Sequence, residues 1–424
     1  MLALLLAPFL VLMTSGSGSA SAVTVLCLPK ADETACIAST MGSRAEPIAG
    51  VDVILTAPDG SEQTVTTGDD GKWSFEVTET GDYTVSADPK TLPDGFELEN
   101  ETVDVKVDKL GGSFGAILQL RSEDYSAETS KTDEIIQSTV NGLRLGLLLA
   151  LASVGLSLIY GTTGLSNFAH AEQVTLGGMM GYLFVNQWGL NLWVGGLLVV
   201  LFCAFTGWGQ DRVLWQPLRR RGLGLTQMMI VTIGLSLALQ YTYQYLVGAR
   251  TVRVVQDNPE VSTFGPVTIT HQSIVAMAIS VVVLAAVGYA LLRTRVGRAT
   301  RAVSDNPALA AASGIDTDKV IRLVWTVAMG LAGLSGLLYA LVVNGIKWDS
   351  GLQILLLLFA AVTLGGLGTA FGALVGALII GLVVELSPVF GMPGDFKYAT
   401  ALLILILLLL VRPQGLLGKP QRVG

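Results

Sequence analysis

Residues 145–175 read LGLLLALASVGLSLIYGTTGLSNFAHAEQVT, an uncharged apolar run that changes abruptly to Gly, Thr, Ser, Asn, His and Glu. The run continues a segment that starts near position 135, and a helix of that length crosses a hydrocarbon core of roughly 30 Å. Gly161 and Gly164 can end such a helix, and Ser166 or Asn167 can cap the next one. The stretch therefore predicts a membrane helix followed by a polar break.

Similar apolar segments recur along the rest of the chain. Hydrophobic residues make up 51% of the sequence and charged residues only 14%, which excludes a single soluble domain and a disordered chain. We predict a mostly α fold, a polytopic membrane helix bundle of about nine segments, of which the second and ninth are short enough to be tilted or re-entrant. The nine segments are 135–160, 171–187, 190–210, 223–246, 272–292, 321–343, 351–368, 370–387 and 397–411.

Charge divides the chain into two parts. Residues 23–130 carry a net charge of −14 and residues 131–424 a net charge of +7. The basic residues fall in short loops between apolar segments and form no extended stripe, so nucleic-acid binding is not expected. We therefore predict an extracytoplasmic domain at 23–125, a linker at 126–134 and a transmembrane domain at 135–424.

The first 22 residues resemble a secretory signal peptide. An apolar run to Met13 is too short to span a membrane, and Ala20-Ser21-Ala22 is an A-x-A cleavage pattern. The alternatives are a wrongly chosen start codon and an anchor that lies on the membrane. Outside the cell, Cys27 and Cys36 are expected to pair in a disulfide, with two free thiols as the alternative.

The acidic part has the pattern of a small antiparallel β-sandwich. Trp73, Phe75 and Val77 alternate along one strand, and Val105 and Val107 along another. Turn pairs of Asp and Gly separate such strands. The motifs PIAGVDV, TGDDGKWSF and GDYTV resemble carboxypeptidase-regulatory-like or transthyretin-like modules, which implies a structural or adhesive role.

Loop charges predict the orientation. If the β domain lies outside, loops 211–222 and 293–322 and the C-terminal tail face the cytoplasm with 13 Lys and Arg residues, against five on the other side. The positive-inside rule then agrees with the signal peptide, and nine crossings place the C-terminus in the cytoplasm.

The polar break has two interpretations, which the sequence leaves open. A helix interrupted at membrane depth exposes N–H groups that favour a carboxylate or a polar solute. Alternatively, the stretch is a cytoplasmic turn whose polar side chains only cap and pair. Under the first interpretation, the candidate substrate path consists of Thr163, Asn167, His170, Glu172 and Gln173. No nucleophile elbow and no metal-ligand spacing accompanies them, so we expect no hydrolase, metal or cofactor.

The basic loop 293–322 contains a second candidate site. Asn306 can cap a helix that Pro307 begins, residues 309–313 continue it with mostly small side chains such as Ala311, and Gly314 can end it. A small-faced helix that projects from a membrane protein suits insertion into a groove of a partner. The alternative is an ordinary amphipathic loop helix.

Four separated motifs in 135–424 resemble the permease subunits of branched-chain amino acid ABC importers. They are GLSNFAH at 164–170, GRATRAV at 297–303, VTLGGLG at 362–368 and RPQGLLG at 412–418. That family usually has Gly where this chain has Ala171. The resemblance implies an ATPase coupling loop formed by Gly297, Arg298, Arg301, Asn306, Pro307, Ala311, Gly314 and Ile315.

The resemblance also implies partners in a bacterial inner or plasma membrane. Two permeases, identical or different, pair within the lipid, two ATPases dock at the coupling loops, and an extracytoplasmic binding protein delivers the amino acid. The chain has no G-x-x-x-x-G-K-[ST] motif, so we expect ATP hydrolysis in the partners and no enzyme here. Alternatives are an ABC permease for urea or another small polar solute, an ion-coupled secondary carrier, and a surface adhesion protein with a membrane anchor.

Overall fold

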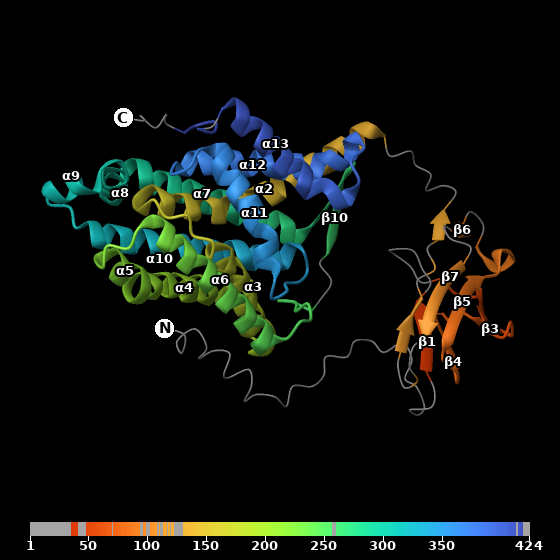
Figure 1. Ribbon diagram of the computed structural model, residues 1–424. Helices are drawn as coiled ribbons and strands as arrows, with labels where there is room; N and C mark the ends of the chain where they lie inside the picture. The colour runs from red at the N-terminus through yellow and green to blue at the C-terminus, as the bar shows by residue number, and fades with distance from the viewer. Residues whose placement is uncertain are drawn as a thin grey trace. The chain divides into compact units, whose positions relative to one another are not determined.

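The computed structural model describes residues 35–40, 48–69, 71–93, 96–98, 102–107, 110, 113–116, 118, 120–122, 130–256, 260–412 and 414–418. The described residues belong to two compact units, which meet in sequence at Ser130 and Lys131. We call them the β unit and the helical unit (Figure 1). The predicted signal peptide, Cys27 and residues 126–129 of the predicted linker lie outside the described residues, whereas 131–134 of that linker already belong to the first helix of the helical unit.

The β unit contains two main sheets. One has the strand order β4-β1-β8 and the other β3-β2-β5-β7, with β6 and β9 forming a separate pair. The strands are β1 (Ala35–Thr40), β2 (Asp52–Thr56), β3 (Glu62–Thr66), β4 (Lys72–Val77), β5 (Gly81–Ala87), β6 (Phe96–Leu98), β7 (Thr102–Val107), β8 (Ser113–Gly115) and β9 (Leu120–Ser122).

The predicted period-2 faces form the core of the β unit. Trp73, Phe75 and Val77 are buried along β4 while the residues between them are exposed. Val105 and Val107 are buried along β7. This alternation confirms the β prediction, since one face of each strand packs and the other meets solvent. Cys36 is buried in β1, and its predicted pairing with Cys27 stays a prediction.

Helices dominate the second unit, together with one hairpin of β10 (Val261–Phe264) and β11 (Val267–Thr270). The α-helices are α2 (Lys131–Thr163), α3 (His170–Gly181), α4 (Leu192–Gln210), α5 (Gln216–Arg220), α6 (Leu225–Val247), α7 (His271–Arg293), α8 (Arg295–Asp305), α9 (Pro307–Ala312), α10 (Thr317–Val342), α11 (Ser350–Gly365), α12 (Ala370–Leu386) and α13 (Lys397–Val411). Two π-helical stretches, η3 (Tyr182–Gln187) and η4 (Asp211–Trp215), extend α3 and α4.

Each predicted apolar segment is helical over most of its length. Six helices among the described residues are long and apolar enough to cross a membrane, whereas α11 and α13 are shorter apolar helices. The predicted count of nine crossings is therefore not confirmed. The bundle itself is confirmed as mostly α, with an N-terminal β domain.

The two ends of the helical unit differ in charge. Figure 1 shows α8 and α9 at one end and β10 at the opposite end. We call these the α9 end and the hairpin end. The basic residues of 211–222 and 293–322 lie at the α9 end, and the described tail joins them there, because Leu416 N–H donates to the Leu364 carbonyl at the end of α11. Lys397 begins α13 at the hairpin end. The basic loops thus lie at the end opposite to Lys397, and the predicted orientation stays a prediction.

Glycines allow the central helices to approach closely. A Cβ at Gly336 of α10 would clash with the Val174 carbonyl oxygen of α3, and one at Gly333 would clash with Cys203. A Cβ at Gly376 of α12 would clash with the Ala361 carbonyl of α11. Close packing of small residues suits membranes, because lipid supplies no hydrophobic drive for helix association.

Candidate functional site

The chain breaks between α2 and α3 as predicted, but the capping differs. Gly164 has φ +68, a left-handed conformation that ends α2 after Thr163. The N-cap of α3 is Ala169, which makes no side-chain cap, so the prediction of Ser166 or Asn167 at that position is wrong. Asn167 acts one step earlier: its Oδ1 accepts from Ala169 N–H at 3.1 Å, and this bond shapes the turn that precedes the helix.

Every residue of α3 is buried, because helices surround it. His170 Nε2 lies 2.9 Å from the Ala152 carbonyl oxygen of α2. Glu172 Oε1 accepts from Ser236 of α6 at 3.3 Å, and Gln173 Oε1 accepts from Thr206 of α4 at 3.1 Å. The polar side chains of this short helix therefore point toward other helices.

Each of these predicted residues also retains an unpaired polar atom. The buried atoms without a hydrogen-bond partner among the described residues include Asn167 Nδ2, His170 Nδ1, Glu172 Oε2 and Gln173 Nε2. Such atoms are costly in a protein interior unless water or a solute binds them. Thr163 differs: it is half-buried, and its hydroxyl donates to the Ile159 carbonyl at 2.6 Å. The structure thus buries four of the five residues in the bundle interior, where the side chains of His170, Glu172 and Gln173 face three different helices.

The predicted coupling loop forms two short helices at the α9 end. Asn306 Oδ1 accepts from Leu309 N–H at 2.9 Å, with Pro307 at the first helical position. Gly314 closes the turn with φ +85. Ala311 is exposed, and the Leu309 side chain is 65% exposed, which places an apolar side chain on the outer surface of α9. The local capping prediction is confirmed.

The other coupling residues support this arrangement. Arg298 and Arg301 are exposed on α8, whereas Gly297 is buried against the end of α7, where a Cβ would clash with the Leu291 carbonyl. Asp316 caps α10, and the pKa of its carboxyl lies below the usual 3.8 because the Lys319 backbone N–H and side chain donate to it.

A hydrophobic cluster joins α9 to the helix break. Ala310 on the inner side of α9 belongs to the same buried cluster as Leu165 in the break, and Ile315 packs against it. The centre of the cluster is a stacked pair, Trp215 and Trp325, with ring centroids 5.2 Å apart. The two sequence-predicted sites therefore contact one buried hydrophobic cluster.

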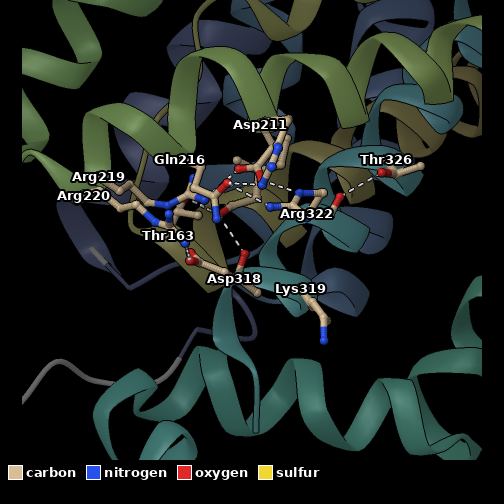
Figure 2. A network of polar contacts seen from close by, with 12 residues as sticks. Thr163, Asp211, Gln216, Arg219, Arg220, Asp318, Lys319, Arg322 and Thr326 are labelled. Atoms are coloured by element: carbon tan, nitrogen blue, oxygen red, sulfur yellow. Dashed lines mark hydrogen bonds and ion pairs between the residues drawn. The ribbon is translucent and has the colours of Figure 1, made fainter.

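A buried ion cluster at the same end was not predicted. Asp211 is fully buried, and its two oxygens lie 2.7 Å from Arg219 Nη2 and 3.5 Å from Arg322 Nε. Gln216 accepts from Arg322 at 2.9 Å. Figure 2 shows these side chains converging from the π-helical end of α4, from α5 and from α10. The cluster connects α10 to the end of α4.

Sequence reasoning counted these arginines only as loop charges. The sequence does contain one indication of this cluster: Asp211 directly follows the apolar segment 190–210, where an acidic side chain needs a nearby cation. The sequence cannot identify Arg322 as that cation, because the two residues are 111 positions apart.

The comparisons identify the class of protein that this fold defines. Residues 138–411 match the family described as branched-chain amino acid transport system / permease component. The match covers more than half of the chain, so the chain belongs to this family and is a multi-pass membrane transport component. Residues 38–116 match a prealbumin-like fold domain, SpaA, which confirms the resemblance to transthyretin-like modules.

Individual relatives are permeases as well. The high-affinity branched-chain amino acid transport system permease protein LivH of Escherichia coli (strain K12) is 29% identical over 303 residues, 68% of this chain and 96% of the relative. The corresponding protein BraD of Pseudomonas aeruginosa is 28% identical over 305 residues, with the same coverage of 68% and 96%. A probable LivH of Methanocaldococcus jannaschii is 30% identical over 287 residues, 64% of this chain and 89% of the relative. No solved structure matches the chain.

Proposed function

We propose that the chain is the permease subunit of an ABC importer for branched-chain amino acids, driven by ATPase subunits in trans. The observation that carries this proposal is the exposed, doubly capped helix α9, whose inner side packs into the cluster that also holds the helix break. The relatives' names supply the substrate class. Family membership favours this function over an ion-coupled carrier and over an adhesion protein, and the relatives' names favour it over a urea permease.

The proposed mechanism is alternating access. ATPase closure pushes on α9, and Ala310 and Ile315 pass the displacement to the stacked tryptophans. Leu165 then moves with the cluster and shifts the break at 164–169. Because the unpaired polar atoms of Asn167, His170, Glu172 and Gln173 lie directly behind that break, the same movement opens or closes a polar path for the solute. Thr163 lies at its cytoplasmic edge.

The coupling role of α9 is tested by Ala311→Arg. Ala311 is exposed on α9, so a large charged side chain there blocks an ATPase groove without disturbing the fold. We expect leucine uptake by reconstituted vesicles to fall at least about tenfold while membrane insertion is normal. The matched control is Ala249→Arg, an exposed alanine outside the coupling loop. Normal uptake by Ala311→Arg would contradict the coupling role.

The substrate path is tested by Asn167→Leu. This change keeps the size of the side chain but removes the amide that faces the break. We expect uptake to fall while ATPase activity of the assembled transporter persists, and Asn186→Leu, a half-buried amide in η3, serves as the control. Unchanged uptake by Asn167→Leu would show that solute passes elsewhere.

The proposed assembly follows from the family and the charge distribution. The α9 end faces the cytoplasm and the ATPases, and the hairpin end faces a secreted solute-binding protein. The β unit lies outside the cell as a structural or adhesive module after removal of residues 1–22. A second permease, identical or different, pairs with this chain in the bacterial inner or plasma membrane, and ATP hydrolysis is left to the partners.

A further inference from the structure

A cavity of about 300 Å³ opens near the hairpin end, away from the predicted substrate path. Its walls come from the first half of α2, the end of α10 and of α12, and the beginnings of α11 and α13. Its position near the hairpin end is fixed by Arg144, whose Nη1 donates to Ser273 Oγ at 3.2 Å, three residues after the β10–β11 hairpin. In the proposed orientation, this cavity is close to the side at which a binding protein releases its solute.

Three charged side chains line the cavity: Arg144, Glu385 and Lys397. Lys397 Nζ lies 3.4 Å from Glu385 Oε1, and the two side chains are 30% and 23% exposed. Among the described residues, no carboxylate lies within ion-pair distance of Arg144. Glu385 attracts the half-buried guanidinium across the cavity without lying within ion-pair distance, so the guanidinium keeps N–H donors available to a ligand.

The remaining wall of the cavity is mixed: aliphatic side chains form one part, and Tyr339, Gln353 and Tyr398 add polar groups. Leu145, Leu148 and Ile354 lie on the side between α2 and α11. A site of this kind combines a guanidinium outside ion-pair distance of any described carboxylate, a partly exposed carboxylate and an aliphatic surface within a volume at the lower end of the range for small-molecule pockets. These are the three features that a small zwitterion with a branched side chain would contact.

We propose that this cavity is an outer binding site for the free branched-chain amino acid, an inference that rests on the proposed function. Arg144 binds the ligand carboxylate, because a guanidinium fork matches the two oxygens of a carboxylate. Glu385 binds the ligand ammonium group in place of, or together with, Lys397. The aliphatic side chain packs against Leu148 and Ile354. Solute thus binds here before it reaches the break behind α3.

The competing explanation is that the three charges only hold α12 and α13 in place. A structural cluster has no preference among ligands, whereas a binding site distinguishes a carboxylate from an amide. The experiment therefore compares uptake of leucine with uptake of leucinamide, which lacks the carboxylate, in vesicles that contain the full transporter and enclosed ATP.

We expect Arg144→Gln to reduce the ratio of leucine uptake to leucinamide uptake by about tenfold or more, because one charge-assisted hydrogen bond to the carboxylate is lost. Arg144→Lys should restore part of it. The control is Arg250→Gln, an exposed arginine that does not line the cavity, and it should leave the preference unchanged. An unaltered preference in an active Arg144→Gln transporter would overturn the site.

A second measurement remains valid if Arg144→Gln fails to assemble. Val343 lines the cavity and is 56% exposed, so Val343→Cys offers a thiol for maleimide labelling at the entrance. Millimolar leucine should slow the labelling and leucinamide should not; equal labelling rates with and without leucine overturn the site. If the unmodified transporter imports leucine while the rates stay equal, only this inference fails. If it imports no branched-chain amino acid, the proposed function fails.

Discussion

Replacing Asp211 by asparagine tests the buried ion cluster that connects α5 with α10. The Asp211 carboxylate is fully buried between Arg219 at 2.7 Å and Arg322 at 3.5 Å. Removing one partner of a buried ion pair leaves uncompensated charge in the interior and costs about 3–5 kcal/mol. Asparagine keeps the size and one acceptor oxygen, so we expect a loss near the lower limit, about 3 kcal/mol of unfolding free energy.

The matched control is Asp318→Asn in the same region. Asp318 accepts from Arg220 at 2.9 Å, but the two side chains are 36% and 66% exposed. Exposed ion pairs contribute only about 0–1 kcal/mol to the free energy of unfolding, because water and salt screen the charges and pairing costs side-chain conformational entropy. The two substitutions thus remove the same chemical group, in one case from a buried position between two arginines and in the other from an exposed ion pair with one arginine.

Heat denaturation of the purified protein in detergent, followed by tryptophan fluorescence, measures the difference. The stacked pair Trp215 and Trp325 belongs to the neighbouring cluster and contributes to that signal. We expect the midpoint of Asp211→Asn to fall by roughly 5–10 °C and that of Asp318→Asn by no more than about 3 °C. Equal shifts would refute the argument that burial decides the energetic weight of the cluster.

Two further predictions concern helix packing and capping. Gly336→Ala places a Cβ against the Val174 carbonyl of α3 and should destabilise the bundle by at least about 2 kcal/mol. Gly234→Ala in α6 should be tolerated, because a Cβ there meets open space. Similar thermal midpoints for the two variants would contradict the close packing of α10 on α3. Asn306→Ala removes the cap of α9 at a cost of about 1 kcal/mol and should lower the amount of leucine taken up per ATP hydrolysed. Asn306→Asp should preserve this ratio, because a carboxylate also caps a helix. The same ratio in both variants would show that the cap is not needed.

Local features of the molecule were predictable from the sequence. The end of α2 at Gly164, the cap and first proline of α9, and the alternating β4 face depend on residues within a few positions of one another. The cap of α3 was missed, because Asn167 offers an equally local alternative, a bond to Ala169 N–H two residues on. Rules based on neighbouring residues cannot decide between a helix cap and a turn when the same side chain can form either hydrogen bond.

The sequence by itself determined the division into an acidic β domain and an apolar helical domain, since composition and hydrophobic period depend on neighbouring residues alone. Only the tertiary structure decided which distant polar groups meet. Ser236 reaches Glu172 across 64 positions, Gln216 meets Arg322 across 106, and Ser335 donates to the Leu148 carbonyl across 187. These pairings depend on how closely glycine-lined helices pack, and that spacing is a property of the whole bundle rather than of any single segment.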